Sequence, residues 1–239
     1  MALPLYLAET AAEMGGNTVL PPIPACMACH FSPGGTGLSG LSAFLPPGSM
    51  LILDDSTPMG NHNPEQILRE LTAAVERFSS ECVLLDFQRP GNPAQQELAA
   101  LLAVSLPCPV GVSEHYAKEG LACPVFLPPL PLHLPLAEYI APWKGRPVWL
   151  ELMPACEVYA ITAKGCTKSA CQDTGTFRHF DEPACCRYRI EVSEDAIRFI
   201  LARGPLELEQ LRRSEEIDCF VGLYQDFAQP EAQATALDQ

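Results

Sequence analysis

The sequence predicts an α/β fold, namely a small and partly irregular (β/α)8 barrel of the TIM type. Three short apolar runs that end in acidic residues alternate with two amphipathic segments between residues 49 and 114. The chain holds eight strand-like runs in all, which is the number that closes a barrel with a packed interior. Many of its 24 prolines lie in the connections, which favours this barrel over an open doubly wound sheet with full-length helices.

The eight expected strands are short apolar runs of the parallel type. In chain order they cover residues 3–9, 26–31, 49–55, 82–87, 109–114, 124–127, 147–152 and 218–224. In folds of this kind, ligands bind beyond the carboxyl ends of the strands. The polar residues at the ends of these runs therefore mark the expected site.

Asn63 and Asn92 mark the starts of the two clearest helices. Each Asn is followed by a Pro at the first helical position and then by a Gln that can close a capping box. The apolar residues share one face of each segment: Ile67, Leu71, Ala74, Val75 and Phe78 in the first, and Leu98, Leu101, Leu102 and Leu106 in the second. A further helix is expected from Pro205, just before the last strand.

One insertion, residues 164–201, interrupts the alternation. Residues 188–192 and 196–201, which are separated by a short polar turn, predict an antiparallel hairpin. No long linker divides the chain, so we expect a single barrel domain over residues 1–228. The tail 229–239 has no apolar pattern and is expected to be disordered.

The insertion is rich in cysteine and poor in apolar residues. Its four cysteines are Cys166, Cys171, Cys185 and Cys186. Structural zinc, a disulfide pair and unligated thiols are all open for them, and the irregular spacing favours unligated thiols. We expect Phe177 and Phe180 to hold the insertion by packing on the rim of the barrel.

The charge and the cysteine count bound the partners and the compartment. The net charge is −14 with no basic cluster, which argues against a nucleic-acid partner. No apolar run is long enough to span a membrane, and the N-terminus lacks the features of a signal peptide. We therefore expect an acidic, cytoplasmic protein whose eleven cysteines are thiols, with its oligomeric state left open.

Residues 26–30, Cys-Met-Ala-Cys-His, match the attachment pattern of c-type haem and contain a C-x-x-C pair. Covalent haem is attached outside the cytoplasm. A redox pair usually opens a helix, whereas helix-breaking Pro and Gly follow here. We therefore expect buried thiols at this position, and no metal or cofactor.

The fourth expected strand resembles that of the glycoside hydrolase family 18 barrels, the chitinases and their relatives. That family carries D-x-x-D-x-D-x-E at the end of its fourth strand, and this chain reads Glu-Cys-Val-Leu-Leu-Asp-Phe-Gln over residues 81–88. Asp86 matches the last Asp, Leu84 replaces the middle Asp, and Gln88 stands where the family has its general acid. An amide cannot protonate a leaving oxygen, so the family mechanism cannot run from position 88.

The resemblance implies a carbohydrate-like or other small polar ligand at the C-terminal mouth of the barrel, with hydrolysis by relocated carboxylates left open. The candidate catalytic residues are Asp86, Glu114 and Glu151. The candidate ligand-binding residues are Asp54, Asp55, Gln88, Trp149, Tyr224 and Asp226. The alternative is a non-catalytic interaction protein whose Cys-rich insertion, with or without zinc, carries the function.

Overall fold

Eight parallel strands form a closed barrel in the computed structural model, which describes residues 4–8, 26–32, 37–38, 47–55, 63–117, 121–171 and 175–227. The barrel strands are β1 (Leu5–Ala8), β2 (Cys26–Ser32), β4 (Met50–Asp54), β5 (Cys82–Asp86), β6 (Val110–Ser113), β7 (Val125–Leu127), β8 (Val148–Leu152) and β14 (Cys219–Leu223). The pairing of β1 with both β14 and β2 closes the ring. The short β3 (Gly37–Leu38) pairs antiparallel with β2. All eight expected strands are confirmed, and residues 82–86 form the fourth strand of the barrel.

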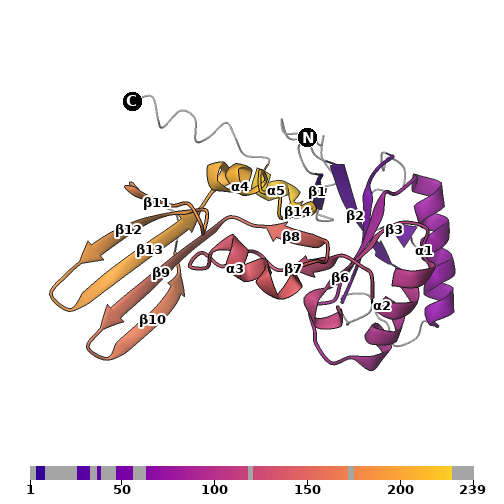
Figure 1. The fold of residues 1–239 in the computed structure, drawn as a ribbon, viewed down its shortest axis with the longest axis horizontal. Helices are drawn as coiled ribbons and strands as arrows, with labels where there is room; N and C mark the ends of the chain where they lie inside the picture. The colour runs from indigo at the N-terminus through magenta and orange to yellow at the C-terminus, as the bar shows by residue number, and fades with distance from the viewer. Residues whose placement is uncertain are drawn as a thin grey trace.

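Two full-length helices, α1 (Pro64–Phe78) and α2 (Pro93–Ser105), cover one side of the barrel (Figure 1). The side chain of Asn63 caps α1 by accepting from the N–H of Glu65 at 3.0 Å, and Asn92 caps α2 in the same way. The expectation that each Gln closes a capping box is wrong, because Gln66 donates to Glu70 at 2.8 Å and Gln95 of α2 donates to Asp55 at 2.5 Å.

The remaining helices in the described part of the chain are short. They are η3 (Glu114–Tyr116), α3 (Leu136–Ile140), η4 (Ala141–Trp143), α4 (Pro205–Leu211) and α5 (Tyr224–Phe227). The expected helix at Pro205 is confirmed as α4. Among the described residues, no helix has the length and apolar character needed to cross a membrane.

Alternate residues of the strands fill the barrel interior. The buried cluster there includes Tyr6, Met50, Ile52, Leu84, Phe126, Trp149 and Val221. Gly111 is needed opposite the indole ring, because a Cβ at this position would lie 2.2 Å from Cε3 of Trp149. The interior of the barrel is therefore a packed core and not a pore.

A second sheet of five antiparallel strands extends from the barrel between β8 and β14 (Figure 1). Its strands are β9 (Ala155–Thr162), β10 (Gly165–Ala170), β11 (His179–Asp181), β12 (Cys186–Val192) and β13 (Ala196–Arg203), in the order β10-β9-β13-β12-β11. The expected hairpin is confirmed as β12 and β13. The sheet is longer than the insertion expected at 164–201, because β9 follows β8 directly and pairs with the whole of β13.

A disulfide joins β9 to the end of β10. Cys156 and Cys171 are linked, with their Cα atoms 5.2 Å apart. The expectation that every cysteine is a thiol is therefore wrong for this pair, since neighbouring antiparallel strands bring the two residues within bonding distance.

The other three cysteines of the insertion remain thiols. Cys185 and Cys186 are buried, and their thiols donate to the carbonyls of Glu207 and Leu132 at 3.0 Å each, whereas Cys166 is exposed. Within the described residues, no group of three His, Cys, Asp or Glu is placed to hold a metal ion.

The two phenylalanines do not anchor the insertion on the barrel rim, which corrects the expectation. Phe177 lies under the guanidinium groups of Arg187 and Arg189, at 5.1 and 5.3 Å from its ring centroid. Phe180 is 44% exposed. Phe177 precedes β11 and contacts β12, and Phe180 lies on β11, so the contact that joins the sheet to the barrel is made by other residues.

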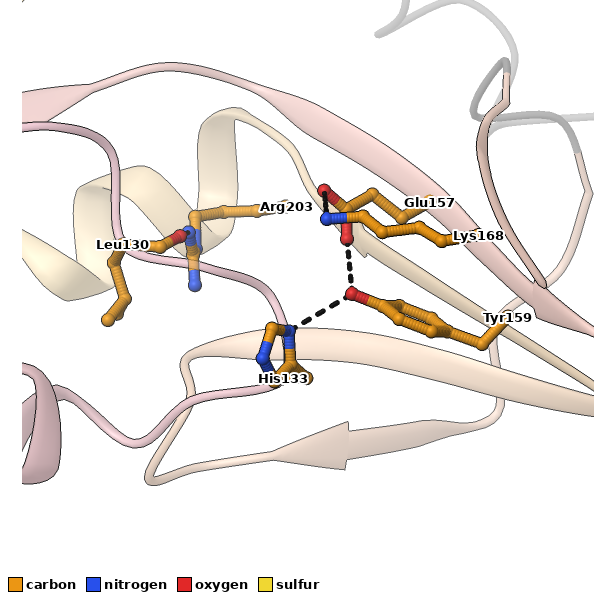
Figure 2. Close-up of polar contacts among 6 residues, drawn as sticks. All are labelled: Leu130, His133, Glu157, Tyr159, Lys168 and Arg203. Atoms are coloured by element: carbon orange, nitrogen blue, oxygen red, sulfur yellow. Dashed lines mark hydrogen bonds and ion pairs between the residues drawn. The ribbon is translucent and has the colours of Figure 1, made fainter. Parts of the chain in front are cut away.

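Arg203, at the end of β13, makes that contact. It is 2% exposed, and burial lowers the pKa of its guanidinium. Its nitrogen atoms donate to three carbonyl oxygens, those of Cys185 at 3.0 Å, Ala184 at 2.6 Å and Leu130. Leu130 follows β7, and Figure 2 shows its carbonyl beside the guanidinium. Arg203 thus fastens the sheet to the segment that follows the sixth barrel strand.

An exposed polar network supports the same junction (Figure 2). The hydroxyl of Tyr159 donates to Glu157 at 2.8 Å and lies 3.0 Å from Nδ1 of His133, in the segment after β7. Lys168 of β10 forms an ion pair with Glu157 at 2.9 Å. These side chains bridge β9, β10 and the barrel segment from outside.

Candidate functional site

Three neighbouring strands bring polar side chains to the C-terminal mouth of the barrel: His30 from β2, Asp54 from β4 and Asp86 from β5. The residue two positions before each of them lies in the barrel interior, so the alternation of side chains points all three inward. His30 Nε2 lies 3.3 Å from Asp54 Oδ2. Asp54 and Asp86 are direct neighbours in the register of β4 and β5.

Asp86 is held by the amide that replaces the family acid. The Nε2 of Gln88 donates to Oδ1 of Asp86. Burial raises the pKa of Asp86, and the negative charges of Asp54 and Asp55 raise it further, while the bond from Gln88 and the nearby His30 act in the opposite direction. The net effect is a carboxyl group with a raised pKa whose orientation is set by position 88.

Glu151 of β8 is the most strongly shifted carboxyl group of the mouth. It stands two residues after Trp149, which lies in the interior, so it points inward too. Burial raises its pKa to about 7, with smaller contributions from the charges of Asp86 and Asp226. Glu151 can therefore donate or accept a proton near neutral pH. Asp226 on α5 is half-buried and close enough to act on it.

Tyr139 of α3 lies near both Glu114 and Glu151. Burial raises the pKa of Tyr139, and the charges of these two carboxylates raise it further. The hydroxyl of Tyr139 donates to the carbonyl of Pro128 at 2.9 Å. The structure thus brings the three candidate catalytic carboxylates, Asp86, Glu114 and Glu151, to one end of the barrel.

Three candidate ligand-binding residues need a different account. Asp55 is bound by the chain itself: its carboxylate accepts from the N–H of Arg89 at 2.8 Å and from Nε2 of Gln95 at 2.5 Å. Trp149 is 5% exposed and belongs to the core, so it does not offer an open ring at the mouth. The side chain of Tyr224 lies outside the described residues.

Sequence reasoning missed His30 and Tyr139. His30 stands at the end of the second strand with the same parity as the interior Ala28, and this signal was available from the sequence. Tyr139 is brought in by a short helix after β7 and had no local signal.

The C-x-x-C pair of β2 is divided between two sides of the barrel wall. Cys26 packs against the interior cluster, whereas Cys29 is buried in the outer cluster. Residues three positions apart on a strand point to opposite faces. The two thiols therefore do not form a redox pair in this fold.

A cavity of about 720 Å³ lies at the opposite, N-terminal end of the barrel. Its lining includes Pro109, Pro124, Pro147 and Tyr6, at or near the starts of strands. The inward carboxyl groups with raised pKa values, Asp86 and Glu151, lie at the C-terminal mouth and not at this cavity. Burial raises the pKa of the Cys82 thiol at this end to about 12, so this thiol is protonated at neutral pH.

The pH dependence of the free energy of unfolding should reflect the titration of Glu151. Its folded pKa of about 7 lies above the ordinary 4.5, so its contribution to stability is complete below the lower value and is lost as pH rises through the higher one. We expect the Glu151→Gln variant to be more stable than wild type by up to about 3 kcal/mol at about pH 8, with the gain shrinking towards about pH 5.

Urea unfolding of both proteins across this pH range measures the effect. Glu97→Gln, which changes an exposed carboxylate of α2, is the matched control and should follow the wild-type profile. Parallel profiles of wild type and Glu151→Gln would show that Glu151 is ionised in the folded protein and would contradict the prediction.

Comparisons with known proteins place this barrel beside chitinase-like structures. No protein-family model matches the chain, and no curated protein matches it either. Among solved structures, the chitinase-like agglutinin RobpsCRA of Robinia pseudoacacia is similar, with a TM-score of 0.58 and 12% identity over 93% of this chain and 95% of that one.

Two further structures agree with this fold. A mutant family 18 chitinase of Cycas revoluta in complex with (GlcNAc)4 has a TM-score of 0.51 and 11% identity, covering 95% of this chain and 96% of that one. The spore cortex-lytic enzyme SleL of Bacillus cereus has a TM-score of 0.50 and 8% identity, covering 95% and 72%. The fold is that of the family 18 barrels, and such low identities establish the fold alone.

Proposed function

We propose that this family 18-type barrel binds a neutral carbohydrate of the N-acetylglucosamine type at its C-terminal mouth and does not hydrolyse it from position 88. The observation that carries the proposal is the Gln88 amide, which donates to Asp86 where the family has its acid. An amide can hydrogen-bond a sugar but cannot protonate a leaving oxygen. The similar chitinase of Cycas revoluta, whose structure contains (GlcNAc)4, supports the ligand class.

The other mouth residues suit a neutral sugar. Asp54 and Asp86 offer carboxylate oxygens to sugar hydroxyl groups, and Glu151 in its protonated form offers a donor. The negative charge of these groups, and of the chain as a whole, disfavours phosphorylated or acidic sugars. The same charge disfavours a nucleic-acid partner.

Hydrolysis by a relocated acid has one observation in its favour. Glu151 has a pKa of about 7, which suits a general acid at neutral pH. Asp86 lies near enough to act on that pKa, so a second carboxyl group is present. Glycoside hydrolysis uses such a pair, one as acid and the other as nucleophile or base. We rank this function second because neither carboxyl group stands in the motif position of the family acid.

The experiment is a calorimetric titration with chitotetraose together with an assay for released shorter oligosaccharides. We expect wild type to bind without turnover, and Asp86→Asn to bind at least about tenfold more weakly, since a charge-assisted hydrogen bond is worth about 1.5–3 kcal/mol. Glu97→Gln is the control and should bind as wild type does.

Two outcomes would contradict this function. Absence of binding to chitotetraose would remove the ligand class. Turnover by wild type that disappears in Glu151→Gln would make the protein a hydrolase and identify its acid. Gln88→Glu should not create turnover, because Leu84 leaves Asp86 without the neighbouring Asp of the family motif.

The cytoplasmic location remains a proposal, and the Cys156–Cys171 disulfide weighs against it, because disulfides persist mainly in oxidising compartments. Alkylation of the thiols in intact cells, followed by mass analysis of the protein, distinguishes the reducing cytoplasm from an oxidising compartment. Alkylation of both residues would support the cytoplasm.

A further inference from the structure

The five-stranded sheet carries an apolar face at the end that lies away from the barrel. Ile161 pairs with Ile197, Ile197 pairs with Val192, and Phe199 pairs with Ile190 in the register of β9, β13 and β12. Residues paired across neighbouring strands share a face of the sheet, and so do residues two positions apart on one strand. Ile161, Ile190, Val192, Ile197 and Phe199 therefore form one continuous surface, here called the apolar face.

These side chains are open to solvent. Val192 is 75% exposed, and the three isoleucines are each more than 40% exposed, while Phe199 is half-buried. An antiparallel sheet commonly packs one face on a core and leaves the other face polar. A surface made of four large aliphatic side chains and one aromatic ring on a sheet that projects from the barrel is instead typical of an interaction site.

Part of the remaining sheet is covered by the chain itself. On the opposite face, Ile200 is 6% exposed and Phe177 packs between two arginines. Near the barrel, Leu201 packs against the buried cluster of Leu132, Ala184 and Cys186. In the part of the chain that the structure describes, Phe180 of the edge strand β11 is the one large apolar side chain exposed on the opposite face, at 44%, so the continuous apolar surface is that at the far end of the sheet.

The distribution of charge along the chain favours a second copy of the chain as the partner of the apolar face. Residues 155–203 contain seven Lys and Arg and seven Asp and Glu, so this segment is neutral, and the whole net charge of −14 is carried by the remainder of the chain. Two barrels would repel each other at close range, within a Debye length of about 8 Å at physiological salt. Two of these sheets can meet without that penalty, with the barrels directed apart.

We propose that the apolar face is where two copies of this chain meet, with the far ends of their sheets packed face to face about a two-fold axis. Such an interface is self-complementary, so each copy presents the same five side chains. Packed sheets lie about 10 Å apart and bury the side chains between them. This interface rests on the insertion sheet and is independent of the proposed sugar site.

Analytical ultracentrifugation over a range of protein concentrations tests the proposal. We expect wild type to sediment at twice the mass of one chain. Val192→Lys should raise the dissociation constant by about 100-fold or more, because the two-fold axis brings two new charges into one apolar interface. Val192 is mostly exposed in the single chain, so the variant should fold normally.

Thr167→Lys is the matched control. Thr167 is exposed on β10 and pairs with Ala160, which places it on the opposite face of the same sheet. This variant should remain a dimer. A monomeric wild type at every concentration, a Val192→Lys variant as dimeric as wild type, or dissociation by Thr167→Lys would each overturn the proposal. Oligomers that grow without limit would overturn the two-fold arrangement.

Discussion

Replacing Arg203 by methionine is expected to lower the free energy of unfolding by about 3–5 kcal/mol, because three buried carbonyl groups lose a charged donor and a hydrogen bond to a charged group is worth about 1.5–3 kcal/mol. Methionine fills part of the same volume, but it leaves the carbonyls of Leu130, Ala184 and Cys185 without their donor. A buried polar group without a hydrogen bond costs about 1–3 kcal/mol. The loss should therefore detach the sheet from the barrel before the barrel itself unfolds.

Urea unfolding followed by far-UV circular dichroism measures the loss. Arg198→Met is the matched control, because Arg198 is an exposed arginine of the same strand, and its substitution should cost less than about 0.5 kcal/mol. Arg203→Lys should fall between the two, since an ammonium group cannot reproduce the planar fork of a guanidinium. Equal stabilities of Arg203→Met and Arg198→Met would contradict the role given to this residue.

Reduction of the Cys156–Cys171 disulfide is expected to cost about 3 kcal/mol, the value for a loop of about 15 residues in the chain-entropy account. The two cysteines are 15 positions apart, and the loop that they close contains the turn between β9 and β10. Without the bond, the unfolded chain has more accessible conformations, and the folded hairpin gains no interaction that compensates for them. β10 is an edge strand, so it should detach first.

Thermal unfolding with and without a reductant provides the measurement. A double variant, Cys156→Ser with Cys171→Ser, should unfold at the same temperature in both conditions and match the reduced wild type. Cys166→Ser changes an exposed thiol of the same hairpin and should keep the response to reductant. A wild type that does not respond to reductant would show that the bond is absent or contributes nothing.

The candidate site was predictable where one strand carries the whole signal. Asp86 ends β5 and Glu151 is the last residue but one of β8, and alternation along each strand points them into the mouth. Asp55 directly follows β4, and its carboxylate accepts from Gln95 and from the backbone N–H of Arg89. Alternation directs Asp55 away from the side of Asp54, but its partner Gln95 stands 40 positions further along the chain and could not be identified from the strand.

The sequence by itself determined the eight barrel strands, the capped starts of α1 and α2, and the place of residues 82–86 as the fourth strand. These features depend on apolar runs and caps within a few residues, where local hydrogen bonding and alternation decide the outcome. Tertiary structure alone decided the reach of β9 along β13, the disulfide and the buried contacts of Arg203. Each of these joins segments that are distant in sequence, and their pairing depends on which surfaces the closed barrel brings together.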